Sequence, residues 1–155
     1  MVRLAFGERW DFGLRPSLSI AQRSFPVEDY RAVVQNAQLC IELSAKAGIA
    51  YYEEPAWTHN PSEEPLKILE ERGEEIAEML GNELESLYTL AEDTEVAAPW
   101  HARSTYGMRS EDGIWLPAVD ICTKVVAEHL LERASRSYKT AVRFSTIWEW
   151  IDEAR

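Results

Sequence analysis

Cysteine is nearly absent from this 155-residue chain, which has two, Cys40 and Cys122. Each lies inside an apolar segment, and the two do not form a CxxC pair. A cysteine in such a segment is expected to be a buried free thiol. The sequence therefore argues against a disulfide framework and against a metal ion held by cysteines.

Long apolar runs are also missing. The longest uncharged apolar stretches are far too short to cross a bilayer. The first residues lack the basic, apolar and small-residue regions of a signal peptide. We therefore expect a cytoplasmic protein without a membrane-spanning helix.

Basic residues are scarce, because 16 lysines and arginines stand against 27 aspartates and glutamates, for a net charge of −11. From Glu53 to Glu95 there are 14 acidic and 2 basic residues, whereas the rest of the chain has 13 acidic and 14 basic ones. Phosphate contacts supply most of the affinity of a general nucleic-acid binder. The composition therefore excludes a general binder of double-stranded DNA. It leaves room for a local basic site, and the acidic segment suits a basic partner.

The motifs of several common enzyme classes are absent too. The chain has no HExxH, no GxSxG elbow, no Walker loop and no GxGxxG. His129 and Glu132 have the spacing of one half of a carboxylate-rich metal site, but no matching second half exists. We predict neither a cofactor nor a metal site.

Strand signals are lacking, and helical spacing of apolar residues takes their place almost throughout. In the first helix the apolar residues recur every three or four positions at Trp10, Leu14, Leu18, Ala21 and Phe25. Pro16 lies within that pattern and predicts a kink or a late helix start.

The second predicted helix runs from near Val27 to about Tyr52. Its core stripe is rich in small residues, so that a neighbouring helix can approach closely. Glu42 and Lys46 stand one turn apart in this helix. We interpret them as a solvated ion pair of small energetic value.

The remaining chain predicts four further segments. A third helix starts at the N-cap candidate Ser62 and stops at Gly81–Asn82, after which helical spacing restarts. Pro99–Pro117 lacks periodicity and is expected to be a loop. A last helix follows from Thr123 to the end, about 45 Å long. Residues 1–155 thus predict a single all-α domain, an up-and-down bundle of four to five helices with a long C-terminal helix.

Four segments in this order carry a family resemblance. They are "ERWDFGL" in the first helix, "SFPVEDYRAVVQNAQLCIELSAKAGIAYY" in the second, "WTHNPSEEPLKIL" at the start of the third, and "RSTYG" before the last. Together they resemble the HEPN family, the higher eukaryotes and prokaryotes nucleotide-binding domain, of archaeal and bacterial type.

The resemblance implies a helical bundle that is commonly dimeric through its long helices. Some members are ribonuclease toxins, others work beside a minimal nucleotidyltransferase as in toxin–antitoxin pairs, and others bind nucleotides or RNA without catalysis. Catalytic members have an arginine followed, after four to six residues, by a histidine. None of His59, His101 and His129 follows an arginine at that spacing. Lys124 stands before His129 instead, and lysine lacks the planar fork of a guanidinium.

Four residues of the last helix are the best candidates for binding phosphate. His129, Arg133, Arg136 and Arg143 lie on one face, at steps of 4, 3 and 7. Arginines one turn apart can each hold phosphate oxygens through two hydrogen bonds. The alternative is a solvated face that forms ion pairs with acidic residues of a neighbouring helix or subunit.

A second group of candidates lies in the predicted loop. His101 and Arg103 stand near Tyr106 and Arg109, and such side chains can bind an anion together when a rigid scaffold holds their loop. The alternative is that they are merely exposed. We expect His59 to fasten the loop before the third helix.

These observations predict a non-catalytic HEPN-like module, a homodimer, that recognises a nucleotide or an RNA phosphate or pairs with a nucleotidyltransferase. Two alternatives stay open. One is a ribonuclease with a rearranged site made of His101, Arg103 and His129. The other is a structural homodimer subunit without a ligand.

Overall fold

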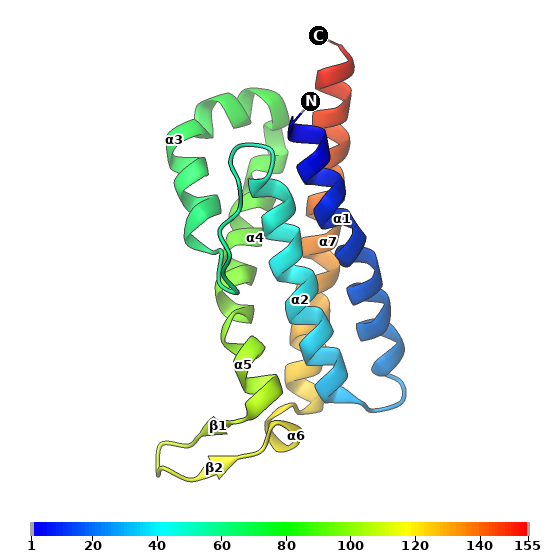
Figure 1. Ribbon diagram of the computed structural model, residues 1–155, viewed down its shortest axis with the longest axis vertical. Coiled ribbons are helices and arrows are strands. Elements are labelled where there is room, and N and C mark those ends of the chain that lie inside the picture. Colours follow the sequence, from blue (N-terminus) through cyan, green and yellow to red (C-terminus); the bar gives the residue numbers. More distant parts are fainter. Residues whose placement is uncertain (1, 155) are drawn as a thin grey trace.

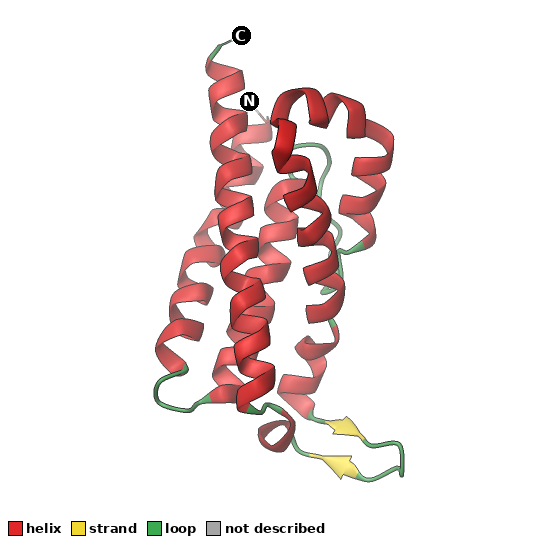
Figure 2. Ribbon diagram, turned by 180° about the vertical axis from the view of Figure 1, so that it is seen from behind, coloured by secondary structure: helices red, strands yellow, loops and turns green. Residues whose placement is uncertain are grey.

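A computed structural model describes the backbone of residues 2–154 and the side chains of residues 13–151, 153 and 154. The longest helices form an elongated bundle (Figures 1 and 2), and their bounds are α1 (Val2–Ser24), α2 (Tyr30–Ile49), α3 (Glu63–Leu80), α4 (Leu84–Ala97) and α7 (Lys124–Glu153). The predicted all-α bundle is confirmed. So is its long C-terminal helix, which has 30 residues and extends past its neighbours (Figure 1).

The segment Pro99–Pro117 is not the loop that its sequence predicted. It contains three short elements, α5 (Pro99–Tyr106), β1 (Met108–Arg109) and β2 (Trp115–Leu116). A fourth, α6 (Ala118–Ile121), follows directly after it. Pro99 begins α5 at a position where proline needs no backbone partner. Gly107 ends it with a φ of +87°, and a Cβ there would collide with the carbonyl oxygen of Leu116. This glycine lets β1 pair with β2.

The central helix is α2, which contacts α1, α4, α5 and α7. Its stripe of small residues is buried, as predicted, and includes Ala37, Ser44, Ala45 and Ala47. The absence of bulky side chains there allows the neighbouring helices to pack closely.

Local residues set the helix ends. Asp29 caps α2 by accepting a hydrogen bond from the backbone N–H of Ala32 (3.1 Å), so the helix begins after the predicted Val27. Gly81, with a φ of +56°, ends α3 as expected and opens the short helix η1 (Gly81–Glu83). Thr123 caps α7 through the N–H of Val126 (3.3 Å). The capped ends fix the two helices that carry the polar sites described below.

The core divides into two apolar clusters. One lies among α1, α2 and α7, and the other contains the aromatic side chains of Tyr51, Phe144 and Trp148. The predicted stripe of α7 is buried at Leu130, Ala134, Ser137, Ala141, Ser145 and Trp148.

The structure tests what the sequence predicted for the first helix and for the two cysteines. The helix α1 continues through Pro16 without the late start considered above. The side chain of Trp10 lies outside the described residues. Cys40 and Cys122 are buried free thiols, as predicted, and burial raises the pKa of Cys40 to about 12.

Among the described residues, none of the helices has a stretch both long and apolar enough to cross a membrane.

We predict that Leu14→Ala lowers the free energy of unfolding by about 2–5 kcal/mol, because the side chain is 1% exposed and its loss leaves a cavity. Leu39→Ala is the matched control, since Leu39 is 38% exposed, and should cost less than about 1 kcal/mol. Urea unfolding followed by circular dichroism measures both. Equal losses in the two variants would contradict this packing.

Candidate functional site

A buried carboxylate joins α4 to α7. Asp93 of α4 is fully buried, and its two oxygens accept hydrogen bonds from Arg133 and Arg136 of α7. The two arginines are three residues apart, so their side chains leave the helix on the same face. Burial of an unpaired carboxylate destabilises the fold, and here two guanidiniums offset that cost.

Asp93 and its two arginines by themselves carry one positive charge in excess, but the carboxylates of Glu92 and Glu132 also act on Arg136. Arg136 binds Asp93 through two nitrogens, with Nε 2.6 Å from Oδ2, and this contact raises the pKa of Arg136. Arg133 donates from Nη1 alone. Two guanidiniums and one carboxylate sum to a charge of +1. Both arginines keep partly exposed side chains, at 27% for Arg133 and 44% for Arg136.

The other two predicted phosphate ligands lie along the same helix. Arg143 pairs with Glu83 at 3.1 Å and remains exposed, and His129 is exposed one turn before Arg133. The structure therefore does form the inter-helix ion pairs considered as the alternative. It brings Arg133 and Arg136 together, and leaves Arg143 and His129 further along α7.

A polar groove lies beside this ion-pair cluster, between α4 and α7. This α4–α7 groove has a volume of about 230 Å³, and its lining includes Asn82, Glu85, Ser86, Thr89, Arg136 and Ser137. Ser137 is 1% exposed, and its hydroxyl has no hydrogen-bond partner among the described residues. A buried polar group of this kind usually has a partner.

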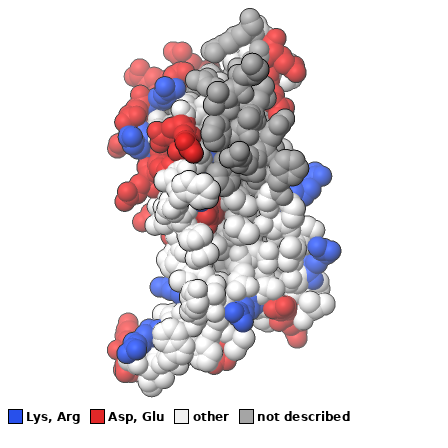
Figure 3. Space-filling model, viewed as in Figure 1, with Lys and Arg blue, Asp and Glu red and all other residues white. Residues whose placement is uncertain are grey.

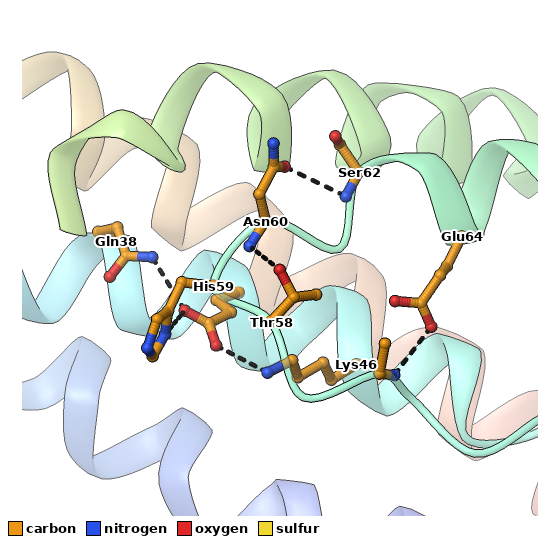
Figure 4. Close-up of polar contacts among 9 residues, drawn as sticks. Gln38, Lys46, Thr58, His59, Asn60, Ser62 and Glu64 are labelled. Carbon is orange, nitrogen blue, oxygen red and sulfur yellow. Dashed lines mark hydrogen bonds and ion pairs between the residues drawn. The ribbon is translucent and has the colours of Figure 1, made fainter. Parts of the chain in front are cut away.

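A second buried carboxylate lies in α2 and shows that one sequence interpretation was wrong. Lys46 forms the predicted pair with Glu42, at 2.8 Å (Figure 4). Both side chains are buried rather than solvated. Gln38 donates a further hydrogen bond to Glu42, at 3.0 Å. Burial by itself would raise the pKa of the Glu42 carboxyl. The hydrogen bonds from Lys46 and Gln38 and the nearby charges outweigh burial and hold the pKa below its usual value of 4.5.

Two histidines cover this carboxylate. Nδ1 of His59 lies 3.3 Å from Oε2 of Glu42, so the loop before α3 is fastened to α2, in line with the role expected of His59 (Figure 4). The ring of His101, in the first turn of α5, stacks on that of His59 with centroids 3.6 Å apart and planes 13° apart. We call Glu42, Lys46, His59 and His101 the Glu42 cluster.

Hydrogen bonds within the loop hold His59 in place. Asn60 donates its N–H to the hydroxyl of Thr58 (3.1 Å), and Asn60 in turn accepts from the N–H of Ser62 (3.3 Å). The backbone N–H of Ala56 donates to Glu64 at 3.1 Å. Figure 4 shows these contacts along the loop above α2.

The remaining candidates of the predicted loop have different surroundings. Arg103 lies over the ring of Trp100, at 5.5 Å, within α5. Tyr106 and Arg109 are exposed at the end of α5 and on β1. The predicted anion site therefore reduces to His101, whose neighbour is His59 rather than Arg109. The sequence held no sign of this contact, because the two histidines are 42 residues apart.

The comparisons with known proteins identify one family. The family model described as the HEPN domain matches residues 15–144, a range that includes Asp93 with its arginines and the Glu42 cluster. Neither the curated proteins nor the solved structures contain a match.

The pKa of Glu42 predicts how stability depends on pH. A carboxyl whose pKa is lower in the folded than in the unfolded state stabilises the fold above the unfolded value, and this contribution is lost as the pH falls through the folded value. Glu42→Gln should cost on the order of 3 kcal/mol at pH 7, because it removes a buried carboxylate that accepts hydrogen bonds from Lys46 and Gln38. Below about pH 4.5 the variant should lose less further stability than the original chain.

Urea unfolding between pH 7 and pH 3 measures this difference. Glu74→Gln, at an exposed position of α3, is the control and should follow the pH profile of the original chain. Parallel profiles for the original chain and for Glu42→Gln would show that Glu42 has no special part in acid sensitivity.

Proposed function

The chain belongs to the HEPN domain family, and we propose that it is a non-catalytic binding module that holds a nucleotide, or a phosphate of RNA, in the α4–α7 groove. The observation that supports the proposal best is Arg136, which lines this groove and which Asp93 holds in place together with the neighbouring Arg133.

Asp93 leaves both arginines with donors to spare. A guanidinium has five N–H donors, and Asp93 uses one nitrogen of Arg133 and two of Arg136. A phosphate needs donors held in a fixed position, because planar guanidiniums bind its oxygens in pairs. The buried carboxylate supplies that fixation, and the N–H donors that Asp93 leaves unused supply the attraction.

The polarity of the groove favours a nucleotide over inorganic phosphate. Glu85 lies in the lining together with Asn82 and Ser86, and a carboxylate repels a bare phosphate while accepting hydrogen bonds from ribose hydroxyls or base amino groups. The volume of about 230 Å³ is below the roughly 300–1,000 Å³ of a pocket that encloses a whole ligand. We therefore expect the groove to hold a phosphate with its sugar and to leave the base more exposed.

Further phosphates of an RNA would lie along α7. Arg143 is two turns from Arg136, and its contact with Glu83 is an exposed ion pair, which costs little to exchange for another anion. His129, on the other side of Arg133, extends the row. In this proposal Arg133 and Arg136 bind the first phosphate, and Arg143 and His129 bind its neighbours.

The acidic face of the molecule limits where such a ligand can approach. Acidic side chains gather over α3 in Figure 3, and its sequence contains Glu63, Glu64, Glu70, Glu71, Glu74, Glu75 and Glu78. This face repels phosphate and suits a basic protein surface. A nucleotidyltransferase partner there is part of the proposal, and pairing of two copies through α7 stays a prediction of the family resemblance.

We predict that Arg136→Lys weakens binding of ATP or of a short labelled RNA about tenfold, because lysine keeps the charge and loses the fork. Fluorescence anisotropy and calorimetry at low and physiological salt measure the affinities. Arg72→Lys, at an exposed arginine of α3, is the matched control and should change nothing. Arg143→Ala should weaken RNA more than ATP.

The same samples separate the alternatives. No binding of either ligand at millimolar concentration would overturn the proposal, as would equal effects of Arg136→Lys and Arg72→Lys. Cleavage of the RNA that disappears in His101→Ala and persists in Arg136→Lys would favour the ribonuclease alternative. That alternative draws its support from the contact between His101 and His59.

A further inference from the structure

The Glu42 cluster brings together three potential metal ligands from three separate segments. Glu42 comes from α2, His59 from the following loop and His101 from the first turn of α5. Each offers one ligand atom, and these atoms lie within 4.8 Å of one another. We propose that Glu42, His59 and His101 form a binding site for a divalent transition-metal ion such as Zn²⁺, a site separate from the α4–α7 groove.

The donor set suits that class of ion. Two imidazoles and one carboxylate form the protein ligands of many zinc sites that keep a position open for water or another ligand. Imidazole nitrogens favour zinc, copper and nickel over Mg²⁺ and Ca²⁺, which prefer oxygen ligands. The structure therefore points to a borderline-soft cation and not to a magnesium site for nucleotide binding.

The carboxylate is already held as a metal ligand needs to be. Lys46 binds Oε1 of Glu42, while Gln38 donates to Oε2, so that the side chain cannot rotate freely. Such outer contacts orient a ligand and raise affinity. Oε2 is also the oxygen that faces His59, and His59 lies between Glu42 and solvent with a side chain that is 64% exposed.

Metal binding requires the two imidazoles to move. In the stacked arrangement the rings are nearly parallel, with centroids 3.6 Å apart, so their nitrogen lone pairs lie in two nearly parallel planes and do not converge on one shared position. Ligands around a tetrahedral zinc, at about 2.0–2.1 Å from it, lie about 3.3 Å from one another. Rotation of the exposed ring of His59 brings its nitrogen toward that geometry. The proposal thus includes replacement of the ring stack by shared ligation.

Charge determines what completes the site. Glu42 already pairs with Lys46, and a bound dication adds two positive charges beside that pair. The open position then favours an anionic fourth ligand, such as hydroxide or a phosphate oxygen. The ion would also fasten α5 to α2 through the loop, because its ligands come from all three.

Metal titration of the full chain, prepared without a histidine tag and treated with a chelator, tests the proposal. Co²⁺ is the first probe, since its visible absorption reports tetrahedral ligation, and Zn²⁺ should displace it. We expect one ion per chain. His59→Ala and His101→Ala should each weaken binding at least about tenfold.

His129→Ala is the matched control, because His129 is an exposed histidine of α7 outside the cluster, and it should leave the affinity unchanged. Circular dichroism and melting temperature check that each variant is folded. His59→Gln replaces His59→Ala should that variant unfold.

Three results would overturn the proposal. They are absence of Co²⁺ and Zn²⁺ binding at millimolar concentration, unchanged affinity in the double variant of His59 and His101, and an equal loss in His129→Ala. None of these readouts depends on nucleotide or RNA binding, so the metal site and the α4–α7 groove succeed or fail separately.

Discussion

The buried carboxylate of Asp93 is the constraint on which the α4–α7 side of the molecule depends. A carboxylate without exposure to water destabilises the fold by several kcal/mol unless cations compensate it. Arg133 and Arg136 provide that compensation and thereby fix α4 against α7. The same contacts hold Arg136 in the lining of the polar groove, next to Arg133. A requirement of folding therefore produces the arrangement that the proposed phosphate site needs.

The second buried carboxylate, Glu42, has different partners and leaves a different surface. Glu42 pairs with Lys46 inside the same helix, and both are buried, so the pair is neutral and does not form a cationic surface. What remains available above it is the pair of imidazoles from His59 and His101. One buried acid thus supports a site for anions and the other a site for a metal cation. The difference follows from the cations that pair with each acid. Asp93 contacts two arginines of another helix, whereas Glu42 contacts one lysine of its own helix.

The sequence predicted the long helices well, since the period of their apolar residues depends on local geometry alone. It failed at Pro99–Pro117, because elements of two to eight residues are too short to show a period. Helical spacing also placed the arginines of α7 on one face. It did not reveal their partner Asp93, which lies on another helix about 40 residues earlier. The contact of His59 with His101, and the burial of Glu42, were hidden for the same reason: both arise when separate segments pack together.

The most direct test of this account is calorimetric titration of Asp93→Asn with ATP, at a temperature where circular dichroism shows the variant folded. The substitution removes one negative charge beside the groove, so general electrostatics alone would strengthen nucleotide binding. If Asp93 acts by holding Arg133 and Arg136 in position, as we propose, binding becomes weaker despite the more favourable charge. Unchanged or tighter binding would contradict the account.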